Sequence, residues 1–160
     1  MGRARVCFTI TTLDDDVWRV MEPGTAPPRQ RLRAMKMLAD AGIPTGIFLA
    51  PVMPRITDSE DHLRAIFEAA ASAGARFVWS SPLRLVPAVR DHYFSAAIEQ
   101  HCPELLTRHA RNYRTPDAPR EHREFVRERI HQLRDEYGLP GEGARPTPAP
   151  VPTQLPLLTA

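Results

Sequence analysis

A repeated order of short apolar runs, amphipathic segments and glycines in the first half of the chain constrains the fold most. Segments with apolar residues at helical spacing run from Arg29 to Ala41 and from Asp58 to Ala73, and Gly42 and Gly74 end them. Three runs rich in β-branched and aromatic residues flank these segments and predict strands at Val6–Leu13, Ile47–Val52 and Ala75–Ser81. This order predicts an α/β fold of parallel strands joined by crossover helices.

The second half of the chain has a different pattern. A short helix is also expected early, at Val17–Met21, but after Pro87 the apolar spacing is helical throughout and predicts helices at Ala88–His101, Pro103–Tyr113 and Pro119–Tyr137. The remaining residues are rich in proline and poor in charge, which predicts a disordered tail. We therefore divide the chain into an α/β unit at 1–86, a helical extension at 87–137 and a tail at 138–160.

Bulk composition excludes little. A chain of 160 residues is long enough for one domain with a sizeable core, and its formal charge of +2 does not by itself indicate a nucleic-acid partner. The two cysteines, Cys7 and Cys102, argue against a disulfide framework, and no apolar run is long enough to span a bilayer. We expect a cytoplasmic protein without a membrane partner.

Motifs for several common chemistries are missing from the sequence. It contains no HExxH zinc motif, no phosphate-binding GxGxxG or GxxxxGK[ST] loop and no GxSxG nucleophile motif. Asp58 and Glu60 are interpreted as a helix cap and a first-turn charge. The six histidines are expected on the surface, because most lie in helical segments with charged neighbours.

Several segments, taken in order, carry a resemblance to a known family. The strand at Val6–Leu13 precedes an acidic turn, an arginine-bearing helix ends in Ala-Gly-Ile-Pro, and the next strand reads Ala-Pro-Val-Met-Pro before Thr57-Asp58-Ser59-Glu60. These segments resemble the second half of a radical SAM core. The nearest resemblance is to the proteins grouped with spore photoproduct lyase and labelled DNA repair photolyase-like. The resemblance covers about residues 5–113.

The resemblance implies a fold and a cofactor. Radical SAM cores are partial (β/α) barrels of six strands, of which this chain would form the last three βα units. In the family a CxxxCxxC loop holds a [4Fe–4S] cluster, and S-adenosylmethionine is cleaved reductively to a 5′-deoxyadenosyl radical that acts on the substrate. Substrate identity is open, with nucleic acid as one option.

This chain departs from the family in one decisive respect, because it contains no CxxxCxxC. We expect the chain alone to bind no cluster and to be inactive. Two explanations stay open: a truncated product that lacks the N-terminal half of the barrel, or a genuine small protein. In the second case the chain could be a non-catalytic half-barrel that docks onto a partner chain carrying the cysteines.

The resemblance also implies candidate cofactor contacts at the ends of the three strands. These candidates are Thr9, Thr11, Ala50, Pro51, Ser80 and Ser81. Each has a plainer interpretation, since threonines favour strands and prolines terminate them. The family's usual glycine after the second proline is Arg55 here, which puts the shape of that loop in question.

The arginine-rich segment from Arg108 to Arg134 could form a basic surface for nucleic acid. The same segment holds many carboxylates, so a mixed-charge face in contact with solvent is the preferred interpretation.

Overall fold

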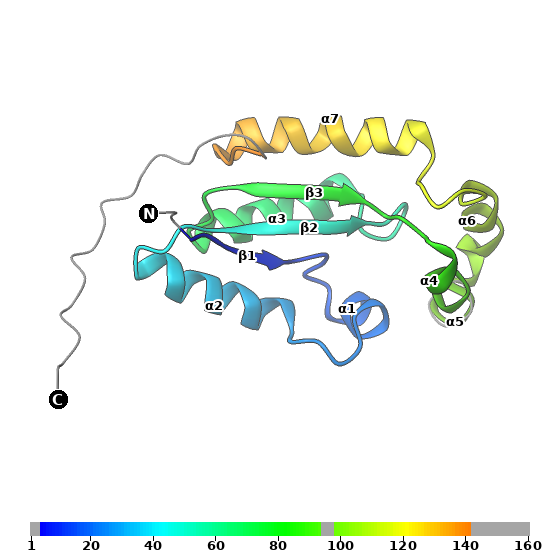
Figure 1. Cartoon of the computed structure of the whole chain (residues 1–160), viewed down its shortest axis with the longest axis horizontal. Helices are drawn as coiled ribbons and strands as arrows, with labels where there is room; N and C mark the ends of the chain where they lie inside the picture. Colours follow the sequence, from blue (N-terminus) through cyan, green and yellow to red (C-terminus); the bar gives the residue numbers. More distant parts are fainter. Residues whose placement is uncertain (1–3, 94–97, 142–160) are drawn as a thin grey trace.

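The computed structural model describes residues 4–93 and 98–141, and in this part of the chain three strands form one sheet in the order β1-β2-β3. Both strand pairs are parallel. The elements are β1 Val6–Thr9, α1 Asp15–Met21, α2 Pro28–Asp40, β2 Thr45–Val52, α3 Glu60–Ser72, β3 Val78–Pro82, α4 Pro87–His92, α5 Glu99–His101, the 3₁₀ helix Pro103–Leu105, α6 Leu106–Asn112 and α7 Arg120–Tyr137 (Figure 1). The predicted α/β fold with parallel strands is confirmed.

The helices begin and end where local chemistry allows. The Asp14 carboxylate caps α1 by accepting from the backbone N–H groups of Asp16 and Val17. Gly42 and Gly74 follow α2 and α3 with φ of +78° and +81°, the left-handed conformation that glycine adopts without steric cost. The predicted helix ends are confirmed at both positions.

The first strand is shorter than the predicted Val6–Leu13. The Ile10 N–H still donates to the Phe48 carbonyl at 3.1 Å, but the chain then turns away, and the Thr12 hydroxyl accepts from the Asp14 N–H. β3 also begins later than predicted, because the Ala75 N–H bonds back to Ala70 at the end of α3. Turn and cap hydrogen bonds therefore take residues whose composition favours a strand.

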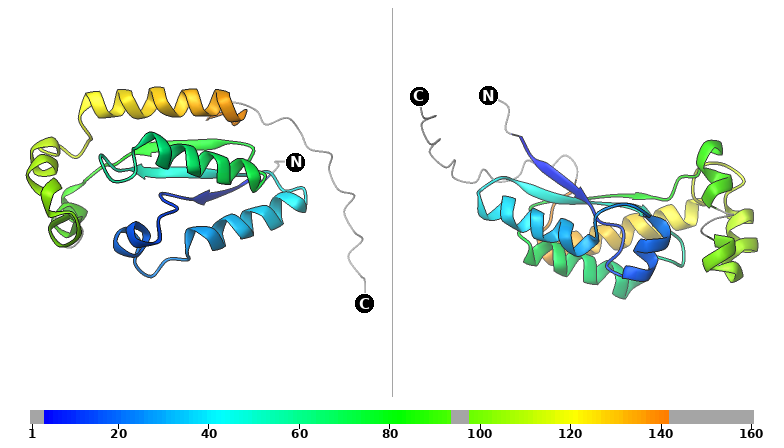
Figure 2. Two further views of the ribbon diagram at one scale, coloured as in Figure 1. Left: turned by 180° about the vertical axis from the view of Figure 1, so that it is seen from behind. Right: turned by 90° about the horizontal axis from the view of Figure 1, so that it is seen from below.

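All three long helices cover the same face of the sheet. Figure 2 shows α2, α3 and α7 on one side of the strands and, among the described residues, no helix on the other. The core on the covered side is continuous from the sheet to α3 and α7, and its fully buried members include Ile47, Leu49, Ile66, Phe67, Val78 and Ile130. α7, which the sequence analysis places in a helical extension, is therefore part of the core of the sheet.

The chain that follows α7 closes part of the outer edge of β3. The Val78 N–H donates to the Pro140 carbonyl at 3.1 Å, and the Val78 carbonyl accepts from Arg134 Nε at 3.0 Å. Leu139 is 4% exposed and belongs to the core. The prediction of a disordered tail from residue 138 is therefore wrong for residues 138–141, and residues 142–160 lie outside the described part.

The segment between β3 and α7 forms a second apolar cluster beyond the carboxyl ends of the strands (Figure 1). Its buried members are Met53, Leu83, Leu85, Tyr93, Ile98, Tyr113 and Ala118. The predicted helix at 88–101 corresponds to α4 and α5, and residues 94–97 between them lie outside the described part. In the described ranges no helix is long and apolar enough to cross a membrane.

Gly46 lies at the base of the face that no helix covers. A Cβ atom added there would lie 2.4 Å from both the ring and the carbonyl oxygen of Phe77, so the aromatic ring covers the glycine directly. The neighbouring β1 residue in the register is Cys7, which is exposed. The close approach of the Phe77 carbonyl oxygen and ring thus requires glycine at position 46.

We predict that Gly46→Ala lowers the free energy of unfolding by about 1–3 kcal/mol, because β3 must shift to accept the methyl group. Urea denaturation monitored by circular dichroism measures this change. The matched control is Cys7→Ala on the paired residue, expected to stay within about 0.5 kcal/mol of the parent chain. If the Gly46→Ala protein were as stable as the parent chain, the close contact between position 46 and Phe77 would be contradicted.

Candidate functional site

The uncovered face of the sheet carries a row of side chains that crosses all three strands. Thr9 pairs with Phe48, and Phe48 pairs with Trp79, so the three lie side by side. Thr9 is exposed and Phe48 is 37% exposed. The guanidinium of Arg5 lies 5.3 Å from the centre of the Trp79 ring. Phe48 and the half-buried Trp79 therefore form a partly exposed aromatic surface at this face.

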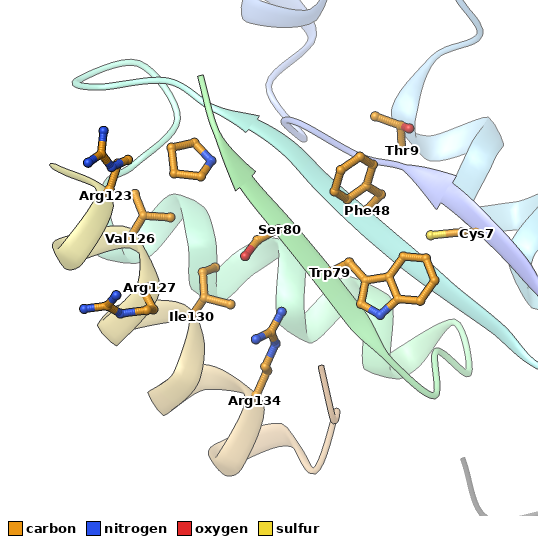
Figure 3. Close-up of a pocket in the computed structure, with 11 residues that line it drawn as sticks. Cys7, Thr9, Phe48, Trp79, Ser80, Arg123, Val126, Arg127, Ile130 and Arg134 are labelled. Carbon is orange, nitrogen blue, oxygen red and sulfur yellow. The ribbon is translucent and has the colours of Figure 1, made fainter. Parts of the chain in front are cut away.

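A groove continues from this face over the edge of β3 to α7. Its cavity volume is about 630 Å³, and Figure 3 shows Ser80 pointing toward α7 while Trp79 and Phe48 lie on the other side of the strand. The residues along it are Cys7, Thr9, Phe48, Trp79, Ser80, Pro82, Arg123, Val126, Arg127, Ile130 and Arg134. Three are arginines and none is acidic. The groove therefore combines a cationic wall with an aromatic one.

The six residues predicted at strand ends do not form one cluster. Thr9 lies on the open face, and by strand alternation Ser81 lies one row beyond Trp79 on that face, whereas Ala50 lies in the register shift between Leu49 and Val52. Ser80 points the opposite way from Ser81, into the groove beside α7.

The other two candidates are placed differently. Pro51 follows a cis peptide bond at the end of β2 and is half-buried. Thr11 is 2% exposed, and its hydroxyl donates to the Glu22 carboxylate, away from the open face.

A polar network that the sequence analysis did not predict surrounds the end of β1. Arg31 forms an ion pair with Glu22 at 2.7 Å, with the two side chains 14% and 17% exposed. Arg31 also donates to the carbonyl oxygens of Thr9 and Ala26. The loop that carries Glu22 has no hydrophobic periodicity, so nothing in the sequence indicates that it folds back onto Arg31.

The loop between β2 and α3 is fixed by several hydrogen bonds. Arg55 has a φ of +61°, the left-handed conformation that the family's glycine would adopt easily. The Asp58 carboxylate accepts from the Arg55 N–H at 2.7 Å, and the Thr57 hydroxyl accepts from the Met53 N–H at 2.9 Å. The interpretation of Asp58 as the helix cap is wrong, because Ser59 caps α3 by accepting from the His62 N–H.

Two of the histidines expected on the surface are buried, which corrects that prediction. His109 on α6 is 0% exposed, and its Nε2–H donates to the Pro54 carbonyl at 3.0 Å. Its Nδ1 lies 3.2 Å from the Tyr93 hydroxyl. The His122 side chain is 10% exposed, with Nδ1 3.5 Å from the Asp58 carboxylate. The two histidines thus connect the helical segments α6 and α7 to the β2–α3 loop.

Burial sets the charge state of these histidines. Desolvation lowers the pKa of His109, although the hydrogen bond to Pro54 and the charge of Asp58 act in the opposite direction. Desolvation also lowers the pKa of His122 despite the nearby Asp58. Burial raises the pKa of Tyr113, whose hydroxyl has no hydrogen-bond partner in the described part of the chain. At neutral pH the side chains of His109, His122 and Tyr113 beside the Asp58 carboxylate are therefore largely uncharged.

The cysteines do not form a metal centre. Within residues 4–93 and 98–141 no three histidine, cysteine or acidic side chains are grouped so that they could hold a metal ion. Burial raises the pKa of the Cys7 thiol, partly opposed by Arg5, and burial also raises the pKa of Cys102. Both sulfurs favour the protonated form, which binds metals poorly.

Comparison with known proteins finds relatives of undetermined function. Uncharacterized proteins of Mycobacterium bovis and of two Mycobacterium tuberculosis strains are each 33% identical to this chain over 154 residues. The match covers 96% of this chain but 44% of each relative, so the chain spans less than half the length of the curated relatives it matches. No family model and no solved structure matches the chain.

We predict that acid destabilises the fold through His109. Because its pKa is lowered in the folded state, the unfolded chain binds the proton more readily. The free energy of unfolding therefore falls as the pH drops below about 6.5, the usual pKa of histidine, and continues to fall until the folded pKa is passed. The His109→Gln protein should be less stable at neutral pH. Its free energy of unfolding should also fall less steeply as the pH drops, with a slope smaller by up to about 1.4 kcal/mol per pH unit for one proton.

Urea denaturation at several pH values between about 5 and 8 tests this, a range centred on the usual histidine pKa. His122→Gln should flatten the curve in the same way, since desolvation also lowers the pKa of His122. His131→Gln is the control, because it replaces a histidine whose side chain is 73% exposed on α7. An unchanged slope in the His109→Gln protein would show that His109 does not titrate on unfolding.

Proposed function

We propose that this chain forms the second half of a radical SAM barrel and supplies one wall of the site for S-adenosylmethionine. The observation that carries the proposal is the parallel sheet covered by helices on one face alone. In a (β/α) barrel the helices lie outside and the other face lines the interior. Cys7, Thr9, Phe48 and Trp79 would then face the interior of the barrel.

The two edges of the sheet support one direction of extension. At the outer edge of β3, the backbone of Val78 forms hydrogen bonds with Pro140 and Arg134. In the described residues β1 pairs with a strand on the β2 side alone. Additional strands therefore add most readily beside β1. The relatives, which are more than twice as long as the matched segment, have enough chain to supply such strands.

The candidate cofactor residues divide under this proposal. Thr9 and Ser81 lie on the face that would be interior, so these two are the better candidates for contact with the adenosyl or methionyl groups, and Ala50 lies in the register shift of β2. Thr11 is engaged with Glu22, and Ser80 faces α7. We assign Thr11 a positioning role at the end of β1 and leave Pro51 as a determinant of loop shape.

The described residues do not fit an iron–sulfur cluster. A [4Fe–4S] cluster needs several cysteine thiolates, and Cys7 and Cys102 are too few and are held as thiols. The cluster would therefore be held by chain outside this sequence. When bound, it would supply the electron that cleaves S-adenosylmethionine, while this chain would hold and shield the cofactor.

The alternative proposal is a non-catalytic half-barrel that docks onto a separate chain. It rests on the same open face, since a parallel sheet is normally covered on both sides. The two proposals differ in whether the missing strands belong to one polypeptide and in whether the assembly cleaves the cofactor.

The first test uses the longer Mycobacterium tuberculosis relative, reconstituted anaerobically with iron and sulfide and reduced with dithionite. We expect it to convert S-adenosylmethionine to 5′-deoxyadenosine and methionine, measured by liquid chromatography with mass detection. This chain alone, treated identically, should give neither product. Absence of 5′-deoxyadenosine from a reconstituted relative that shows cluster absorption would refute the radical SAM assignment.

The second test addresses docking. The part of the relative that lies outside the match, produced as a separate chain, should form a one-to-one complex with this chain in size-exclusion chromatography. Phe48→Lys should abolish the complex because it places a charge on the face to be buried. Phe125→Lys is the matched control, since Phe125 on α7 is 41% exposed and lies outside the groove. Equal effects of the two substitutions would contradict docking on the open face.

A further inference from the structure

α7 presents a row of arginines to the groove. Arg123, Arg127 and Arg134 are spaced by four and seven residues, which places them on one stripe of the helix. At a rise of about 1.5 Å per residue, the row extends for roughly 16 Å. Figure 3 shows the three side chains along α7 beside Ser80 and β3.

The carboxylates of α7 lie away from this stripe. Glu121, Glu124, Glu128 and Asp135 fall on another stripe, and two of them are engaged with neighbours outside the groove, Glu124 with Arg120 and Asp135 with His131. The expected mixed-charge face is therefore divided by the helix into an acidic side and a basic side. The basic side is the one that borders the groove.

None of the three arginines forms an ion pair with a carboxylate in the part of the chain that the structure describes. Arg123 donates to the Ala118 carbonyl at 2.8 Å, and Arg134 Nε donates to the Val78 carbonyl at 3.0 Å. Arg134 is half-buried, and desolvation lowers its pKa. A cation partly removed from water normally has an anionic partner, and no described residue supplies one, so the row of arginines is open to an anionic ligand.

The groove becomes aromatic where it passes over the edge of β3 onto the open face of the sheet. Trp79 lies on the edge strand β3, with Phe77 at 5.1 Å between ring centres. Arg5 adds a further positive charge above these two rings, at 5.3 Å from Trp79 and 5.7 Å from Phe77. A positively charged track with aromatic side chains beside it is the arrangement that binds the phosphates and bases of a single nucleic-acid strand.

We propose that the groove between β3 and α7 binds single-stranded nucleic acid, with phosphates on Arg123, Arg127 and Arg134 and a base against Trp79. The length of the row favours a chain of phosphates over one phosphate group, and the unstacked bases of a single strand are free to contact an aromatic ring. The site consists of residues of this chain and requires neither the cluster nor S-adenosylmethionine. It therefore extends beyond the proposed radical SAM function.

Fluorescence anisotropy with a fluorescein-labelled single-stranded oligonucleotide of about 12 nucleotides tests the proposal. Arg127→Ala should weaken binding roughly tenfold and should make the salt dependence shallower by about 0.7, the value for one lost phosphate contact. Arg127 has no partner in the described residues, so its removal should leave the fold intact. Arg19→Ala is the matched control, because Arg19 lies on α1, is 62% exposed and pairs with Asp16 outside the groove.

The outcomes separate the possibilities. Loss of binding in the Arg127→Ala protein with normal binding in the Arg19→Ala protein supports the groove, whereas equal weakening in both overturns it in favour of diffuse charge attraction. Trp79→Leu should also weaken binding roughly tenfold through lost stacking. Inorganic polyphosphate that competes as well as the oligonucleotide at equal charge, or a mononucleotide that binds as tightly, would overturn the nucleic-acid assignment. No oligonucleotide binding at low salt refutes the proposal even if the relative cleaves S-adenosylmethionine.

Discussion

Burial of the sheet on one face alone is the constraint on which the rest of the structure depends. Helices α2, α3 and α7 remove the apolar residues of that face from water, and residues such as Ile47, Leu49 and Val78 are fully buried there. The opposite face has no equivalent cover in the described residues. This asymmetry accounts for the exposure of Phe48, for the packing of the Phe77 ring on Gly46 and for the groove.

α7 connects the fold to the candidate site. Its apolar side, with Val126, Ile130 and Leu133, completes the core, and its basic side forms one wall of the groove. Arg134 takes part in both, because it donates to the Val78 carbonyl and borders the cavity. A ligand in the groove would therefore contact the same helix that closes the edge of β3.

The loop after β2 shows how buried polar groups can hold a functional strand end in place. Desolvation keeps His109 and His122 largely neutral at pH 7; His109 donates a hydrogen bond from α6 to the loop, and His122 on α7 lies 3.5 Å from the Asp58 carboxylate. The left-handed backbone at Arg55 is accommodated by the Asp58 carboxylate. The strand end nearest the proposed cofactor wall thus depends on residues far along the chain.

By itself, the sequence determined the order of strands and helices and the glycine helix ends, because hydrophobic periodicity and left-handed glycine are local properties. It could not assign Ile10–Leu13, where hydrogen bonds to the following turn end the strand, or Leu139 and Pro140, which pack on distant β3. It could not separate Ser80 from Ser81 by function, or show which stripe of α7 borders the groove. Those distinctions depend on which side of a strand or helix meets a neighbour, and only the tertiary structure decides that.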